Sequence, residues 1–202
     1  MKRTRFLSAF IITIATLFVG CGLSFGVMHI KDYTPTKSGK GMLSIKKMDS
    51  VKIRLGNFTA ANPKQNSVKC DTARISLPEK QNFETYIKNA FAAEFKAADM
   101  YDENAQITLY GHINEIYSMI KRKQWIIDIT ITSSNGKSFN PEIQYPYIEN
   151  YEGKFDCDAA ANTFNRAVKQ LIYKMVNDKE FLELLEVPKK EEPSYYKRSF
   201  WE

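Results

Sequence analysis

Apolar residues alternate with polar ones in several stretches of the chain, and this alternation predicts strands with one buried face. The stretches are 51–58, 73–77, 106–117, 125–132 and 138–147. The last one contains Pro141 and Pro146, which lack a backbone N–H, so we expect it at a sheet edge. Between 132 and 138 the dipeptide Asn135-Gly136 predicts a tight hairpin turn.

Two other stretches repeat apolar residues every three or four positions, which predicts helices with one buried stripe. The first runs from Phe83 to Ala98, with Glu94 at the border of its stripe, and the second runs from Asp158 to Met175. A short helix at 181–185 follows a break near Asn177. This order predicts an α+β fold of two layers, with two main helices on one face of a mostly antiparallel sheet of four to five strands.

The N-terminus has the composition of an export signal. The first five residues include three basic ones, and the stretch from Phe6 to Gly20 is uncharged and mostly apolar. A basic segment followed by an apolar one is typical of a secretory signal peptide, which we assign to residues 1–20.

The end of this signal resembles the lipobox of bacterial lipoproteins. It reads Leu17-Phe18-Val19-Gly20-Cys21, with a small residue before the cysteine and Phe18 where the usual residue is Leu. The resemblance implies that Cys21 becomes the first residue of the mature chain and carries diacylglycerol and an N-acyl chain. Gly22 stands where Asp would signal inner-membrane retention, so the resemblance implies an outer-membrane anchor facing the periplasm.

A second interpretation stays open, because the uncharged stretch continues past Cys21 as far as Lys31. A stretch of that length can cross a bilayer core of about 30 Å. The chain would then be an uncleaved single-pass protein of the same envelope class.

Composition divides the rest of the chain into three parts. Residues 21–45 are rich in Gly, Pro and hydroxyl side chains, which predicts a lipidated N-terminus followed by a flexible tether. Residues 46–186 form the periplasmic domain, and residues 187–202 form a charged and aromatic C-terminal tail.

The three cysteines fit export. With Cys21 assigned to lipid, Cys70 and Cys157 remain as an even pair in an oxidising compartment, and we expect a disulfide between them.

The charged residues do not indicate a catalytic, metal or nucleic-acid site. The net charge is +6, and removing the three basic residues of the signal leaves 26 − 23 = +3, an ordinary balance that gives no reason to expect nucleic acid. The two histidines, His29 and His112, lack the spacing of zinc ligands. We therefore expect a protein that is not an enzyme, with no metal and no cofactor other than the lipid on Cys21.

Aromatic residues cluster at the end of the fifth predicted strand and just after it, and they predict an interaction surface, since such residues are enriched at interface hot spots. They are Tyr145, Tyr147, Tyr151 and Phe155.

The order of elements from 51 to 185 is similar to small modules of Gram-negative envelope lipoproteins, of the TolB amino-terminal and LpoB-like type. Those relatives act mostly through protein contacts. The resemblance implies a non-enzymatic interaction or assembly module of the cell envelope, attached to the membrane and bound to an envelope protein. The alternative function is a carrier or chaperone for a lipid or glycan, which would need a pocket between the sheet and the helices.

Overall fold

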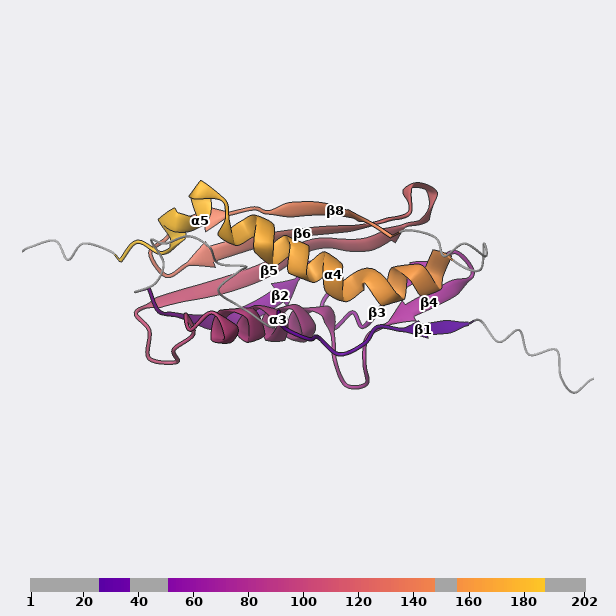
Figure 1. Cartoon of the computed structure of the whole chain (residues 1–202), viewed down its shortest axis with the longest axis horizontal. Coiled ribbons are helices and arrows are strands. Elements are labelled where there is room, and N and C mark those ends of the chain that lie inside the picture. The colour runs from indigo at the N-terminus through magenta and orange to yellow at the C-terminus, as the bar shows by residue number, and fades with distance from the viewer. Residues whose placement is uncertain (1–25, 37–50, 148–155, 188–202) are drawn as a thin grey trace, which may run out of the picture.

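The protein has an α+β fold, seen in a computed structural model that describes residues 26–36, 51–147 and 156–187 (Figure 1). Two sheets and three helices lie in these ranges. In chain order the elements are β1 (Val27–His29), β2 (Ile53–Ala60), β3 (Ser67–Cys70), β4 (Ala73–Ser76), α3 (Phe83–Ala97), β5 (Ile107–Met119), the 3₁₀ turn Ile120–Arg122, β6 (Gln124–Ser133), β7 (Ser138–Phe139), β8 (Glu142–Pro146), α4 (Asp156–Val176) and α5 (Lys179–Leu184).

The larger sheet has five strands in the order β2-β5-β6-β7, and β8 also pairs with β6. All its pairs are antiparallel except β2 with β5, which is parallel. This confirms the mostly antiparallel sheet that the sequence predicts. As expected from its prolines, β8 lies at an edge, since it pairs with β6 alone.

The long hairpin of β5 and β6 forms the centre of this sheet and carries its apolar face. On β6 the side chains of Trp125, Ile127, Ile129 and Ile131 are fully buried. They alternate with Ile126, Asp128 and Thr130, of which Ile126 is also buried. The register shifts between Ile113 and Glu115 on β5. Such a bulge inserts one residue into a strand, so the apolar side chains on both sides of the shift point to the same face.

The three helices cover this apolar face and contact one another across it. The rings of Phe83 on α3 and Phe164 on α4 meet with centroids 5.7 Å apart, and Phe95 on α3 stacks on Phe181 of α5. The Asn82 side chain caps α3 by accepting a hydrogen bond from the Thr85 N–H at 2.8 Å. Figure 1 shows the helices in front of the larger sheet, as expected for a two-layer fold.

A second sheet departs from the sequence prediction. It has three strands in the order β1-β4-β3, and β1 lies within the segment predicted as a flexible tether. β1 pairs in parallel with β4, and Ile30 just beyond it is buried with 2% exposure. Residues 26–36 are therefore packed on the domain. The prediction was wrong for these residues because a strand of three residues has too little alternation to detect, and its partner lies more than forty residues away.

The close approach of Gly111 on β5 to the Phe58 ring on β2 allows the packing of the larger sheet to be tested. A β-carbon added to Gly111 would come within 2.5 Å of two ring carbons of Phe58. That ring also contacts the ring of Phe91 on α3, with centroids 5.6 Å apart. We expect Gly111→Ala to lower the free energy of unfolding by about 1–3 kcal/mol, because the partly buried Phe58 ring must move from its packed position against Phe91. Urea denaturation of the purified protein measures this loss.

The matched control for this prediction is Gly26→Ala, whose added β-carbon approaches only the flexible end of Met28, at 3.3 Å. We expect its free energy of unfolding to change by about 0.5 kcal/mol or less. Equal losses in the two variants would contradict the packing argument.

Candidate functional site

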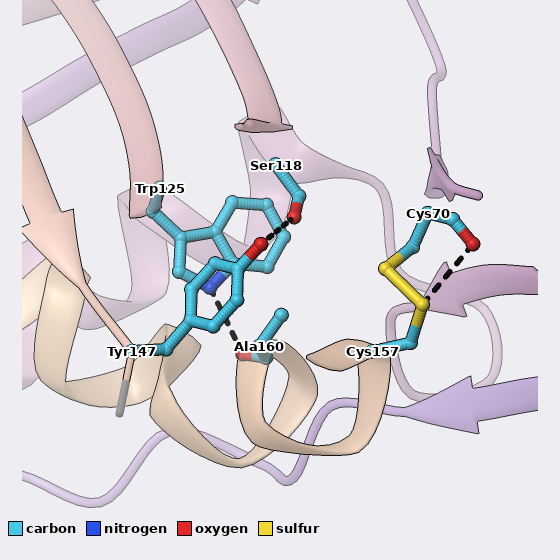
Figure 2. Close-up of a disulfide and its surroundings, with 6 residues drawn as sticks. All are labelled: Cys70, Ser118, Trp125, Tyr147, Cys157 and Ala160. Carbon is cyan, nitrogen blue, oxygen red and sulfur yellow. Dashed lines mark hydrogen bonds between the residues drawn. A yellow bond between two sulfur atoms is a disulfide. The ribbon is translucent and has the colours of Figure 1, made fainter. Parts of the chain in front are cut away.

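The disulfide predicted between Cys70 and Cys157 is present and joins the smaller sheet to α4. Cys70 ends β3 and Cys157 lies in the first turn of α4, with their Cα atoms 5.8 Å apart. Both residues are buried, and the Cys157 Sγ lies 3.1 Å from the Cys70 carbonyl oxygen (Figure 2). The bond closes a loop of 87 residues. In the chain-entropy model, closing a loop of this length stabilises a fold by about 4–5 kcal/mol.

Two hydrogen bonds lie beside the disulfide, and the first of them fixes the start of α4 against the central hairpin. The Trp125 indole N–H donates to the Ala160 carbonyl at 2.9 Å, and the hydroxyls of Tyr147 and Ser118 share a bond of 3.0 Å. Figure 2 shows these residues beside the disulfide. The first turns of α4 therefore contact both sheets.

The aromatic surface predicted near β8 is not confirmed by the described residues. Tyr147 is 2% exposed, so it belongs to the core and cannot contribute to a surface. The physical reason is the buried partner that its hydroxyl finds in Ser118. Tyr145 is half-buried on β8 and packs against the core. Tyr151 and Phe155 lie outside the described residues.

A polar contact at Glu94 on α3 holds the end of residues 26–36, which we call the N-terminal segment. One carboxylate oxygen, Oε1, accepts hydrogen bonds from the Tyr33 hydroxyl at 2.6 Å, the Thr36 N–H at 3.1 Å and the Thr36 hydroxyl at 3.3 Å. Glu94 is 1% exposed, and its other oxygen is buried without a hydrogen-bond partner among the described residues. Burying a carboxylate away from water costs free energy unless the group accepts hydrogen bonds. The N-terminal segment supplies these hydrogen bonds.

A second polar contact, at Tyr86 of α3, holds the middle of the same segment. The Tyr86 hydroxyl donates to the Lys31 carbonyl at 3.0 Å and also bonds to the Asn165 side chain of α4. The Asn165 amide in turn donates to the Asp32 carbonyl at 3.0 Å. Residues 31–36 therefore lie across both main helices.

Burial raises the pKa of both tyrosines well above the ordinary value. For Tyr33 the hydrogen bond and the charge of Glu94 add to the effect of burial, and for Tyr86 the charge of Asp32 adds to it. Both hydroxyls thus stay protonated while the domain is folded.

Surface grooves of the described residues have the volume of a ligand site. One, of about 430 Å³, lies between β8 and α4, and four of its five lining residues are polar or charged: Glu142, Gln144, Gln170 and Lys174. A second, of about 330 Å³, lies where β2, β5 and the end of α5 meet, beside Val187. A third groove, of about 350 Å³, lies between β2 and α3, and five of its six lining residues are polar or charged: Asn57, Glu84, Thr85, Lys88 and Asn89. The grooves between the larger sheet and the helices are thus mostly polar, whereas a carrier would hold an apolar ligand in an apolar pocket there.

The two histidines lie apart in the described residues. His29 and His112 are both exposed, and His112 lies 2.8 Å from the Thr59 hydroxyl. Within the described ranges no three His, Cys, Asp or Glu side chains gather as a metal site would require. In the same ranges no helix has both the length and the apolar character needed to cross a bilayer.

Cys21, the predicted lipidation site, and the C-terminal tail from residue 188 onward lie outside the described residues. Their roles therefore stay predictions.

The fold itself has a counterpart among solved structures. No protein-family model matches the chain, and no curated protein matches it. The chain is similar to the crystal structure of a Xanthomonas campestris protein of the family DUF330. The TM-score is 0.50 and the sequence identity 12%, over 75% of this chain and 92% of the Xanthomonas protein. At this identity the likeness shows the α+β fold alone.

The buried tyrosines lead to a prediction about alkaline pH. A raised pKa in the folded state means that the native protein holds a proton that the unfolded chain loses above pH of about 10. The contribution of these two protonated hydroxyls to the free energy of unfolding is therefore complete below that pH and is lost as the pH rises further. We expect the thermal midpoint of the wild type to fall above pH 10 more steeply than that of Tyr33→Phe/Tyr86→Phe.

The matched control for the alkaline series is Tyr110→Phe/Tyr173→Phe, which alters two exposed tyrosines, 42% and 44% exposed. This variant should keep the wild-type slope. If both double variants showed the same slope as the wild type, the buried tyrosines would not be the source of the pH dependence.

Proposed function

We propose that this chain is an exported lipoprotein of the bacterial cell envelope. In this proposal Cys21 carries the lipid, and the folded domain acts as a non-enzymatic module that binds an envelope protein. One observation carries the proposal. The chain has three cysteines, the disulfide uses Cys70 and Cys157, and the third stands at the end of the lipobox-like segment.

The disulfide supports export. Disulfides form and persist in oxidising compartments such as the periplasm and are rare in the cytosol. This bond is buried and lies between two elements that must meet for the core to close, which is typical of a structural disulfide. A redox role would instead need an accessible thiolate.

The filled interior favours protein binding over transport of a lipid or glycan. Aromatic rings occupy the space between the larger sheet and the helices: Phe83, Phe91, Phe95, Trp125, Phe164 and Phe181 are each at most 1% exposed. A carrier needs an apolar cavity to accept its ligand. The polar side chains buried near the helices, Glu94 and Tyr86 among them, are engaged in holding the N-terminal segment.

The anchor is tested by mass spectrometry of the full chain expressed in a Gram-negative host. We expect the wild type to begin at Cys21 and to carry the mass of a diacylglycerol and an N-acyl chain. Cys21→Ser should lose the acyl mass completely and retain residues 1–20, because the thioether needs the thiol. The matched control Cys70→Ser/Cys157→Ser should keep the acyl mass although it is less stable.

An intact N-terminus without acyl mass in the wild type would contradict the lipoprotein proposal. Membrane association that survives Cys21→Ser in that case would favour the uncleaved single-pass anchor.

The interaction role is tested by cross-linking the full chain in living cells and purifying it from membranes. We expect one protein adduct to recur in the wild type and to fall severalfold in Cys21→Ser, because a variant that keeps residues 1–20 stays at the inner membrane and is no longer confined beside a partner at the outer membrane. A co-purified lipid or glycan without a protein adduct would contradict the interaction module and favour the carrier.

A further inference from the structure

The two edges of the larger sheet differ in how well they are protected from other chains. On the side of α3 the last strand is β2, which pairs in parallel with β5 alone (Figure 1). At the opposite edge β8 contains Pro146, and its Glu142 carbonyl accepts a hydrogen bond from Lys174 of α4 at 2.6 Å. Prolines and lysines are common means of protecting a sheet edge. β2 contains neither.

The hydrogen bonds at the start of β2 identify which of its backbone groups face outward. The Ile53 N–H donates to the Met100 carbonyl at 2.8 Å, and the Ile53 carbonyl accepts from the Asp102 N–H at 2.9 Å. The backbone groups of Ile53 therefore point away from β5. Since these groups alternate in direction along a strand, the N–H and C=O of Leu55 point away from β5 as well.

Beyond the register shift between Leu55 and Phe58, the outward direction passes to the even-numbered residues. The Ala61 N–H donates to the Ile113 carbonyl of β5 at 2.9 Å, so the backbone groups of Ala60 and Phe58 face away from β5. The outward N–H and C=O groups of Leu55, Phe58 and Ala60 have no hydrogen-bond partner among the residues that the structure describes. Such a row of unpaired donors and acceptors is what another extended chain pairs with.

The groove of about 350 Å³ between β2 and α3 lies directly beside this row, since Asn57 and Phe58 line it. Across the groove stands Glu84 of α3, which is 9% exposed. Its Oε1 accepts a hydrogen bond from the Lys64 N–H at 2.8 Å, whereas Oε2 is buried with no hydrogen-bond partner within the described ranges. A buried acceptor without a partner is costly, so a donor that enters the groove beside Glu84 would be bound favourably.

We infer that an extended segment of a partner protein pairs with β2 as an added strand and places a hydrogen-bond donor in the groove beside Glu84. This inference rests on the proposed interaction role and assigns it a surface. Because side chains alternate along a strand, every second one of the added strand would point toward α3 and the groove. In this mode of binding the main chain supplies affinity and the groove selects a side chain.

The free edge is tested first by amide hydrogen exchange of the isotopically labelled full chain, purified and followed by NMR. We expect the amides of Leu55, Phe58 and Ala60 to exchange at least about tenfold faster than those of Arg54 and Thr59, which face β5. Equally slow exchange would overturn the inference, because residues 37–50 or a second copy of the chain would then occupy the edge.

The surface is tested in living cells with photoreactive benzoyl-phenylalanine in place of Asn57 at the β2 edge or Gln144 at the β8 edge. Both positions are exposed. We expect the protein adduct to form at position 57 at least about fivefold more than at position 144. An adduct at position 144 but not at position 57 would overturn the inference and leave the interaction role standing.

Strand pairing, as distinct from proximity, is tested by adding Ala60→Pro to the chain labelled at position 57. Proline removes an outward N–H and places its ring where the added strand would lie, so we expect the adduct to fall about fivefold or more. The matched control Gln144→Pro changes the opposite edge and should leave the adduct unchanged. An unchanged adduct in both variants would overturn the pairing with β2.

The groove is tested by Asn89→Trp, which fills it from α3 without altering the backbone of β2. This variant stays informative if Ala60→Pro lowers the thermal midpoint. We expect the adduct at position 57 to fall about threefold or more, because the indole occupies the space of the partner's side chain. The matched control Ala97→Trp lies exposed on the same helix and should leave the adduct unchanged. Equal adducts in the two variants would overturn the role of the groove.

The proposed function and this inference fail in different ways. If mass spectrometry finds no acyl group but the adduct at position 57 depends on Ala60, the lipoprotein proposal is wrong and the binding surface stands. If an adduct recurs but is insensitive to Ala60→Pro and Asn89→Trp, the interaction role stands and the surface is wrong. A chain that gives no adduct from any position would contradict both.

Discussion

The packing of α4 on both sheets is the constraint on which the rest of the structure depends. The buried stripe of α4 contacts the smaller sheet near Cys157 and the larger sheet along β6 and β8. A helix of 21 residues is about 31 Å long, close to the length of the ten-residue strand β6. Because the disulfide and the Trp125–Ala160 hydrogen bond fix its first turns, the rest of the helix follows the apolar face of the sheet.

Local patterns in the sequence predict the larger sheet and the helices but not the smaller sheet. Alternation is strong along β5 and β6 because one face of each is buried over its whole length. β1 has three residues, and its position depends on hydrogen bonds with distant residues, which no local pattern contains. Tyr147 looked like part of an aromatic surface for the same reason, since its burial depends on Ser118 across the sheet. Glu94 was the one local sign of the missing contact, because a carboxylate beside an apolar helical stripe needs a partner.

The buried polar groups are used to hold the N-terminal segment. β1 pairs with β4, Lys31 and Asp32 bond to Tyr86 and Asn165, and Tyr33 bonds to Glu94. These three attachments lie along ten residues and involve the smaller sheet and both main helices. The segment that follows the proposed lipid site is therefore part of the folded domain, and the expected tether between anchor and domain is absent over residues 26–36.

This attachment changes how an anchored domain would search for a partner. A long flexible tether gives reach, whereas a short connection restricts the domain to a layer beside the membrane and limits its rotation. Restriction of this kind raises the effective concentration of a partner that lies in the same layer and lowers it for all others.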